Sequence, residues 1–238
     1  MRKETKEFKW RGRLGPMGLA VSEDTFVPST ISVLLADALE IKKDDVVVDV
    51  GCGSGVLSII AAKLGASKVY GIDAASDVVE IATENAVRHG VEKITTFFQG
   101  DLFAPLPDGV EADVIIGDVS GIPDLLADKS GWFPSRRGGG PRGSELPIRM
   151  LEGVQDVLRR GGQFLLPTGT LQDEAAILAK ARCVFSKLNQ VGERTIPLPT
   201  ALSQSAEVLQ LVKDRVIELR ERGSRKLWTA KVWVGSLA

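Results

Sequence analysis

A glycine-rich loop carries the clearest chemical signal in the sequence. Residues 48–56 read VDVGCGSGV, with glycines at positions 51, 53 and 55. Glycine lets the backbone turn sharply and approach a ligand without an obstructing Cβ, and a following helix offers free N–H groups. Asp49, two residues before the first glycine, could hold an ammonium group. Because Val56 replaces the third glycine of the dinucleotide fingerprint G-x-G-x-x-G, the loop suits a zwitterionic amino acid better than a pyrophosphate.

Two more aspartates follow the next two predicted strands. Asp73 comes at the end of the strand 68–72, where a carboxylate can accept both hydroxyls of a ribose. Asp101 lies in the segment QGDL, where it can accept from an adenine amino group while Leu102 packs on the ring. A single aspartate at a strand end can equally be a turn or helix-cap residue. Three in succession, in the order amino acid, ribose, adenine, favour one extended ligand.

A regular alternation of strand and helix patterns must position these residues. The β-branched run 46–50 indicates a buried parallel strand. Such alternation predicts an α/β fold, a parallel sheet with helices on both faces, and ligands in such sheets bind at the carboxyl ends of the strands. We expect strands near 46–50, 68–72, 94–98, 113–117, 163–167, 184–196 and 227–234, and helices near 29–39, up to 64, 76–89, 145–160 and 173–182.

These elements predict a seven-stranded mixed, mostly parallel sheet within one domain covering residues 1–238. Residues 1–28 form an N-terminal arm, which we expect to be helical. Residues 203–222 show apolar positions at helical spacing and are expected to form a helix inserted between the last two strands. Packing of that helix against the sheet is the simplest role for it.

Composition excludes several functional classes. The chain has 238 residues with Lys+Arg 30 and Asp+Glu 31, so its net charge of −1 gives no global attraction to nucleic acid or membranes. His89 is the only histidine, which argues against a Ser-His-Asp hydrolase, and its neighbour Gly90 suggests a helix end. Cys52 and Cys183, the only cysteines, give no disulfide framework or zinc spacing. Without a signal-peptide core or an apolar run of about 20 residues, we expect a cytoplasmic protein with no membrane partner and no metal.

Residues 46–103 resemble class I S-adenosylmethionine-dependent methyltransferases. The segments VVVDVGCGSGVLSIIAAKLGA and VYGID are similar to ribosomal-protein lysine methyltransferases and protein arginine methyltransferases. The segments GDLFAPLP, ADVIIGDVSGIP and EDTFVPS look more like the glutamine methyltransferases that modify release factors. The resemblance implies a Rossmann-like fold and S-adenosylmethionine as cofactor, with S-adenosylhomocysteine as product. The implied donor contacts, with their loop neighbours, are Asp49, Gly51, Cys52, Gly53, Gly55, Asp73, Asp101 and Leu102.

The segment after the fourth predicted strand is the candidate acceptor site. In the release-factor branch this strand ends in Asn-Pro-Pro-Tyr, and here Asp118-Val-Ser-Gly121 aligns with it, so only the first position keeps a comparable polar group. Methyl transfer is an in-line displacement that depends mainly on positioning. We therefore predict Asp118 as the catalytic residue, accepting a hydrogen bond from an acceptor N–H or O–H. A structural turn with Gly117 and Gly121 is the alternative, and Ser120 is a candidate substrate contact.

Two further segments are candidates for substrate binding. The loop 132–143 reads WFPSRRGGGPRG, and Arg136, Arg137 and Arg142 on a flexible backbone could clamp an acidic peptide, a phosphate or a carboxylate. A solvated loop is the alternative interpretation. Phe26 and Pro28 could line the entrance from the N-terminal side, or pack the arm onto the sheet.

The favoured function is methylation of a nitrogen, or less favourably an oxygen, on a protein side chain or a small molecule. An RNA methyltransferase is an alternative that would use the arginines of the loop 132–143 on the phosphate backbone, so nucleic acid is a less favoured partner. A donor-binding protein without catalysis is a second alternative, supported by the altered Asp-Val-Ser-Gly segment. An NAD-linked oxidoreductase is disfavoured by Val56. We make no prediction of the oligomeric state.

Overall fold

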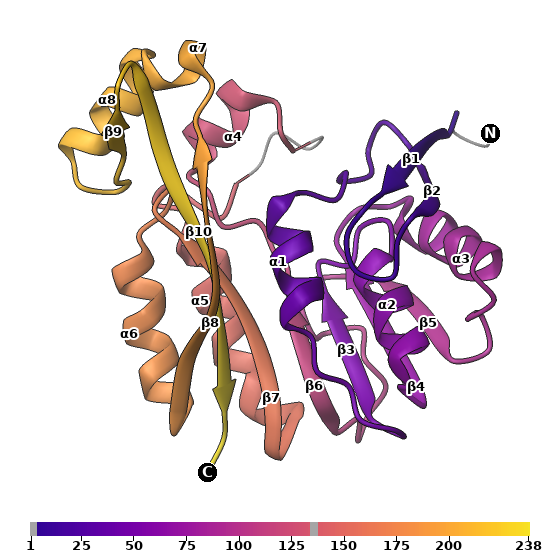
Figure 1. Cartoon of the computed structure of the whole chain (residues 1–238). Helices are drawn as coiled ribbons and strands as arrows, with labels where there is room; N and C mark the ends of the chain where they lie inside the picture. Colours follow the sequence, from indigo (N-terminus) through magenta and orange to yellow (C-terminus); the bar gives the residue numbers. More distant parts are fainter. Residues whose placement is uncertain (1–3, 134–137) are drawn as a thin grey trace.

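The computed structural model describes residues 4–133 and 138–238, and a mixed β-sheet lies at its centre (Figure 1). The strand order is β5-β4-β3-β6-β7-β10-β8, and a short strand, β9, pairs with β10. The first five are parallel, whereas β10 runs antiparallel to β7, β8 and β9. The strands are β3 (Val46–Val50), β4 (Lys68–Asp73), β5 (Thr95–Gln99), β6 (Ala112–Gly117), β7 (Leu158–Gly169), β8 (Lys187–Pro197), β9 (Arg220–Arg222) and β10 (Arg225–Ser236).

Helices cover both faces of this sheet, as alternating strand residues require. Val47 of β3 packs in one apolar cluster with α1, α2 and α3, whereas Val48 and Val50 pack in another with α5 and α6. The helices are α1 (Thr30–Ala38), α2 (Val56–Leu64), α3 (Val78–Arg88), α4 (Asp124–Ser130), α5 (Glu145–Gly153) and α6 (Glu174–Val184). This arrangement confirms the predicted Rossmann-like α/β fold with a mostly parallel sheet.

Successive strands are added on one side of β3 and then on the other. From β3 the chain proceeds to β4 and β5 on one side, then returns to β6 on the other side of β3. In the register of the sheet Val50 lies opposite Ile72 on β4 and Gly117 on β6. The loops that leave β3 and β6 therefore diverge at adjacent strand ends, which is the switch point where α/β sheets bind ligands.

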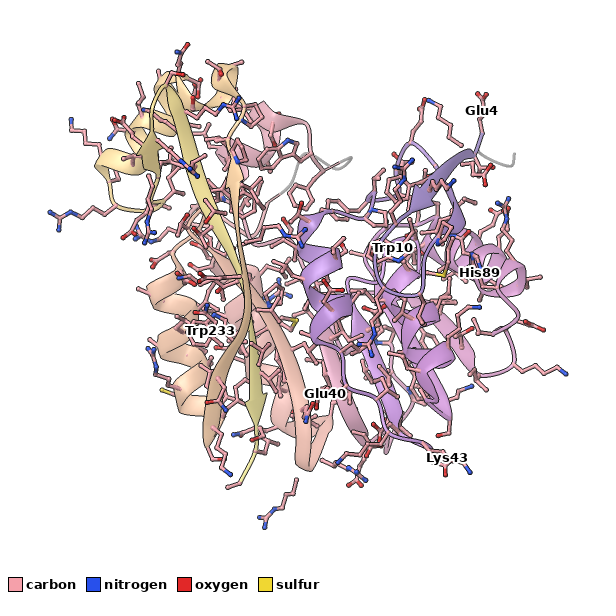
Figure 2. All side chains as sticks on the ribbon, in the orientation of Figure 1. Glu4, Trp10, Glu40, Lys43, His89 and Trp233 are labelled. Carbon is pink, nitrogen blue, oxygen red and sulfur yellow. The ribbon has the colours of Figure 1, made fainter. Side chains whose placement is uncertain are left out.

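The N-terminal arm is a β-hairpin rather than the helix that we expected. Strands β1 (Lys6–Trp10) and β2 (Met17–Val21) pair in antiparallel fashion, and Trp10 is buried against the main core. His89 ends α3 as predicted, and its Nε2 lies 2.8 Å from the carbonyl oxygen of Gly18 in β2. Figure 2 shows Trp10 and His89 in this part of the molecule. The alternation of only a few apolar residues with charges gave too short a period-2 pattern to predict the hairpin.

Asn85 of α3 joins the hairpin to the glycine-rich loop. Its Oδ1 accepts from the Ala20 N–H at 2.6 Å, and its Nδ2 donates to the carbonyls of Ala20 and Ser54, both at 2.9 Å. Asn85 is fully buried, so all three bonds lie in a region where an unpaired polar group would be costly. The arm is thereby fixed beside the loop that follows β3.

Two predicted helices end earlier than expected. The helix predicted over 145–160 stops at Gly153, and the chain enters β7 at Leu158, which pairs with Ala112. Leu158 is buried in β7. A buried leucine fits the apolar face of a helix equally well, so its residue type did not distinguish a strand from a helix. The helix predicted over 203–222 is replaced by α7 (Thr200–Ser203), α8 (Ala206–Lys213) and the hairpin of β9 with β10.

The short elements between β8 and β10 form their own apolar cluster. Leu202, Val208, Leu211 and Val216 pack there against Leu126 of α4. Lys129 of α4 and Glu207 of α8 form an ion pair at 2.9 Å across the same contact. Among the described residues, no helix combines the length and the apolar character needed to cross a lipid bilayer.

Candidate functional site

A cleft of about 950 Å³ opens at the carboxyl ends of the parallel strands. Its lining takes in Gly51 after β3, Asp73 at the end of β4, Asp101 after β5 and Asp118 after β6. Small-molecule sites occupy roughly 300–1,000 Å³, so this cleft lies at the upper end of that range. Four strand-end positions that are far apart in the sequence thus meet at one edge of the sheet.

The loop after β3 is held between the ends of β4 and β6. The N–H groups of Gly51 and Cys52 both donate to the carbonyl oxygen of Ile72, at 2.7 and 3.0 Å. Gly51 has φ +83°, and a Cβ there would lie 2.8 Å from the carbonyl carbon of Asp118 and closer still to its oxygen. Only glycine fits this position, because both the conformation and the space exclude a side chain.

Asp73 is bound by the backbone and still has capacity to accept more hydrogen bonds. Its Oδ2 accepts from the Gly53 N–H at 3.0 Å and its Oδ1 from the Ala75 N–H at 2.9 Å. Each carboxylate oxygen has a second lone pair, so the group can accept from two further hydroxyls. Burial raises the pKa of Asp73, and the two N–H donors oppose that shift. The carboxylate is thus oriented at the cleft wall before any ligand arrives.

Asp49 lies beneath the glycine-rich loop and is fully buried. Its Oδ2 accepts from Ser58 Oγ at 2.6 Å, while its Oδ1 has no hydrogen-bond partner. Burial raises the pKa of Asp49 to about 7, and the nearby charges of Asp118 and Asp73 raise it further against the Ser58 bond. Asp49 does not line the cleft, so the structure places its carboxyl group beneath the loop and not at the cleft wall.

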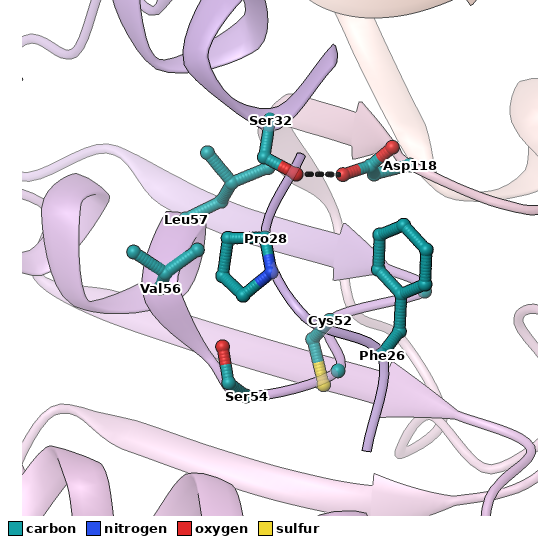
Figure 3. A pocket seen from close by; sticks show the side chains of 10 residues that line it. Phe26, Pro28, Ser32, Cys52, Ser54, Val56, Leu57 and Asp118 are labelled. Atoms are coloured by element: carbon teal, nitrogen blue, oxygen red, sulfur yellow. Dashed lines mark hydrogen bonds between the residues drawn. The ribbon is translucent and has the colours of Figure 1, made fainter. Parts of the chain in front are cut away.

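Asp118 lies on the other side of the loop, within reach of α1. Its Oδ2 accepts from Ser32 Oγ at 3.1 Å, as Figure 3 shows together with the neighbouring Phe26 and Pro28. Burial raises the pKa of Asp118 to about 7, whereas the Ser32 hydrogen bond lowers it. A carboxyl group with this pKa can accept a hydrogen bond when ionised and hold a proton when neutral, near physiological pH.

Acidic side chains outnumber basic ones among the described residues that line the cleft. Its only described basic side chain is Arg149. The field in the cleft therefore favours a cationic ligand, particularly near Gly51, where Asp49, Asp73 and Asp118 influence one another. The acidic residues among the described lining are Asp24, Asp73, Asp77, Asp101, Asp118 and Glu145.

The far end of the cleft contains Asp101, Leu102 and a residue that the sequence did not indicate. Arg149 of α5 donates to Asp101 Oδ2 across the cleft edge, and both side chains are more than half exposed. Leu102 has φ +51°, an uncommon conformation for a non-glycine residue. The bond to Arg149 occupies only one of the Asp101 oxygens.

Only some of the other residues predicted to bind the substrate line the cleft. Phe26 and Ser120 line the cleft, and the Phe26 ring stacks on Phe133 with centroids 5.1 Å apart. Pro28 borders the small hollow beside Asp118. Arg136 and Arg137 lie outside the described residues. Cys52 and Gly55 belong to the buried part of the glycine-rich loop.

The glycine-rich segment near α5 is packed, which corrects our expectation of a flexible backbone there. Gly139 donates from its N–H to the carbonyl of Ile122 at 2.7 Å. A Cβ on Gly138 would lie 2.8 Å from the Asp124 nitrogen, so glycine is needed for close backbone packing. Arg142 pairs with Asp173 at 2.7 Å and does not line the cleft. Its guanidinium is therefore engaged inside the chain.

Sequence reasoning missed several lining residues that come from distant elements. Ser32 belongs to α1, Arg149 to α5, Gln172 to the turn before α6 and Trp228 to β10. None of them lies in a motif, so only the folded topology brings them together. In the described part of the chain, no group of three His, Cys, Asp or Glu side chains is arranged to hold a metal ion.

Comparisons with known proteins find relatives and similar folds. A family model described as ribosomal protein L11 methyltransferase (PrmA) matches residues 27–123. A 16S rRNA N2 G1207 methyltransferase from T. thermophilus, solved in complex with AdoMet and guanosine, superposes with a TM-score of 0.64 at 15% identity, covering 98% of this chain and 51% of that one. The chain has the class I methyltransferase fold. The matched residues 27–123 of this methyltransferase fold include the glycine-rich loop, Asp73, Asp101 and Asp118.

The relatives also show how far the likeness extends. A ribosomal protein L11 methyltransferase of Exiguobacterium sibiricum is 34% identical over 163 residues, which cover 68% of this chain and 51% of the relative. The chain thus spans about half the length of the curated relatives it matches. A precorrin 8W decarboxylase from Methanobacterium thermoautotrophicum has the same fold, with a TM-score of 0.58, 20% identity, and 90% and 95% of the two chains covered. None of these three proteins is a release-factor glutamine methyltransferase, and proteins with this fold differ in substrate.

Proposed function

We propose that this chain is an S-adenosylmethionine-dependent methyltransferase that methylates a nitrogen on a protein side chain. The observation that carries the proposal is the placement of Asp73 and Asp118 on either side of the glycine-rich loop, in one acidic cleft. A carboxylate ready to accept a diol and an acidic field ready for a cation match the two distinctive parts of this donor. The match of residues 27–123 to a methyltransferase family model supports the same assignment.

The residues present fit the donor along the cleft. Gly51 and Gly53 would pass beside its amino-acid part, where a Cβ at position 51 is excluded. Asp73 would accept from the ribose hydroxyls, Asp101 from the adenine amino group, and Leu102 would pack on the ring. The bound donor supplies an electrophilic methyl group on a cationic sulfur, and S-adenosylhomocysteine is the product. Asp49, with one oxygen unpartnered, would add negative charge beneath the ammonium end.

Asp118 would orient the acceptor nitrogen and receive its proton. In this reaction the nitrogen lone pair forms the new N–C bond, the C–S bond breaks, and a proton leaves the nitrogen. Asp118 lines the cleft beside the donor loop, and its pKa near 7 matches a proton transfer at neutral pH. The Ser32 hydrogen bond fixes the carboxylate orientation. Most of the remaining catalysis would come from alignment of the two reactants.

A protein acceptor is favoured by the names of the relatives, and a small molecule is the second candidate. The apolar wall formed by Leu171, Ile196 and Trp228 favours a compact acceptor that enters the cleft. An RNA acceptor is less favoured, because Arg149 is the only basic side chain among the described lining residues and phosphate contacts need several. A donor-binding protein without catalysis stays an alternative that a transfer assay excludes.

The test is a methyl-label transfer assay with the purified chain. The substrates are separate protein, RNA and small-molecule fractions of a cell extract, and donor binding is measured in parallel by calorimetry. We expect label in the protein fraction, and loss of that label with Asp118→Asn while donor binding persists. Label in RNA alone would contradict the proposed acceptor. Donor binding without label in any fraction would favour the non-catalytic alternative.

A further inference from the structure

The cleft has a second half, which the proposed donor does not occupy. It lies beyond Asp118, toward the end of β7 and the beginning of β10, and its wall contains Leu171, Ile196 and Trp228. Neighbouring residues of this wall belong to the apolar cluster that α4 and α8 share. The wall is therefore well packed and mostly apolar, so a polar atom within it is unusual.

Two polar side chains in this half have atoms without hydrogen-bond partners. Gln172 is 9% exposed, and its Nε2 has no partner. Ser120 Oγ is also buried without a partner, and both residues line the cleft. A buried donor left unpaired costs about 1–3 kcal/mol, and native structures contain few such groups. Because both residues line one cleft, the amide N–H and the hydroxyl are candidates for hydrogen bonds to a ligand there.

Glycine at position 121 lets the Gln172 amide pack on the backbone next to Ser120. A Cβ on Gly121 would lie 2.7 Å from Gln172 Oε1, so the amide packs directly on that glycine. Ser120 is the preceding residue, and Asp118 lies two residues before it. The Asp118 carboxylate and the Ser120 hydroxyl thus come from the short segment after β6, and the Gln172 amide packs on the same segment.

We propose that Gln172 and Ser120 form an acceptor subsite that binds a carbonyl-type oxygen next to the nitrogen to be methylated. This inference rests on the proposed function, since it places the acceptor beside the donor loop. Gln172 Nε2 is a donor and requires an acceptor atom, and the Ser120 hydroxyl can supply a second hydrogen bond. Asp118 accepts from the adjacent N–H of the same group. The apolar body of the acceptor packs on Trp228 and Leu171.

An amide-bearing small molecule and a peptide both carry a carbonyl oxygen next to an N–H group, so either one matches this subsite. Two probes distinguish these sources: benzamide, and N-acetylphenylalanine methylamide. Toluene serves as a third probe, because it has the apolar ring but no carbonyl oxygen. Each is titrated by ligand-observed NMR into the protein loaded with S-adenosylhomocysteine. Binding of a carbonyl probe through Gln172 supports the proposal, and the tighter of the two probes identifies the source.

Gln172→Leu is the principal variant and Ser120→Ala the second. We expect Gln172→Leu to weaken the tighter carbonyl probe roughly tenfold, the loss expected for one buried hydrogen bond, and to leave toluene unchanged. The melting temperature of Gln172→Leu should stay equal or rise, because the amide loses no partner inside the protein. Gln190→Leu on β8 is the matched control, since Gln190 is exposed and bonded only to Glu193.

Three results would overturn the subsite. Carbonyl probes that bind no better than toluene would show that the oxygen is not recognised. Probe affinity unchanged in both Gln172→Leu and Ser120→Ala would show that these side chains do not bind it. Unfolding of Gln172→Leu would show that the amide has a structural partner. Failure of the proposed function is a separate result, because S-adenosylhomocysteine would then fail to bind the wild-type protein at all.

Discussion

Ser32 Oγ donates to Asp118 Oδ2 at 3.1 Å and so joins α1 to the end of β6. Ser32 is itself fixed, because its Oγ also accepts from the Ser29 N–H at 3.2 Å in the capping box of α1. The start of a helix that lies 86 residues away in the sequence therefore orients the predicted catalytic carboxylate. The same bond stabilises the ionised form of Asp118 against the effect of burial.

Replacing Ser32 should shift the pH dependence of methyl transfer. The pKa of Asp118 is raised to about 7, so activity should fall as the pH drops through 7 and the carboxylate becomes protonated. Ser32→Ala removes a hydrogen bond to the ionised form, so the pKa rises and the acidic limb moves to higher pH. A bond worth about 1 kcal/mol corresponds to a shift of up to about one pH unit. The measurement is the pH profile of kcat/KM.

Ser76→Ala is the matched control for this prediction, since Ser76 is exposed and precedes α3. It should leave the profile unchanged. An acidic limb that stays in place in Ser32→Ala would show that Asp118 does not control the rate. Lower activity at every pH without a shift of the limb would indicate only a structural role for Ser32.

Gly51→Ala should abolish donor binding, whereas Gly90→Ala should not. Both glycines have positive φ, +83° and +70°, so each substitution introduces similar backbone strain, about 1 kcal/mol. Only at Gly51 would the added Cβ collide with the Asp118 carbonyl group, because nothing lies within 4 Å at Gly90. Calorimetric titration with S-adenosylmethionine compares the two variants. Equal affinities in both would contradict the close packing that we assign to this loop.

Stability without ligand should fall as the pH rises from about 4 to 7. Burial raises the pKa of Asp49 to about 7, whereas an aspartate in an unfolded chain has a pKa of about 3.9. The folded state therefore binds more protons in this window, so the free energy of unfolding decreases with pH and levels off above 7. Asp118 has a similarly raised pKa and contributes in the same direction.

The substitution Asp49→Asn should remove only part of that pH dependence, because the pKa values of Asp118 and Asp73 are also raised. Urea unfolding at pH 5 and pH 8 measures the difference, with Asp108→Asn as an exposed control. At pH 8 the Asp49→Asn variant should be more stable than the wild type by up to a few kcal/mol. A wild-type protein that is more stable at pH 8 than at pH 5 would refute the assignment of raised pKa values.

The gathering of Gly51, Asp73 and Asp101 in one cleft could be predicted from the sequence because these residues follow their strands directly. The β-branched run 46–50 and the glycines after it define one strand end, and Asp73 and Asp101 mark the next two. Parallel strands bring their carboxyl ends to one edge, so the local pattern was enough to gather these residues. Asp49 is the exception, because the sequence does not show that it lies below the loop.

The acceptor half could not be predicted in the same way. Gln172 and Trp228 reach the cleft from the turn after β7 and from β10, and their positions depend on the order of strands at the antiparallel side of the sheet. The triple glycine at 138–140 indicated flexibility by composition, whereas it serves close backbone packing on the residues after β6. In each case the deciding contact is between segments that are distant in sequence.

Calorimetric titration of the wild-type protein and Asp73→Ala with S-adenosylmethionine, with NAD as the competing ligand, tests whether the cleft binds the methyl donor through Asp73. Asp73→Ala would remove two hydrogen bonds that the ribose hydroxyls donate to the charged carboxylate, each worth about 1.5–3 kcal/mol. We predict saturable binding of S-adenosylmethionine to the wild type, an affinity at least about 100-fold lower in Asp73→Ala, and no binding of NAD. If S-adenosylmethionine does not bind, or binds both proteins with the same affinity, the cleft does not hold this donor through Asp73.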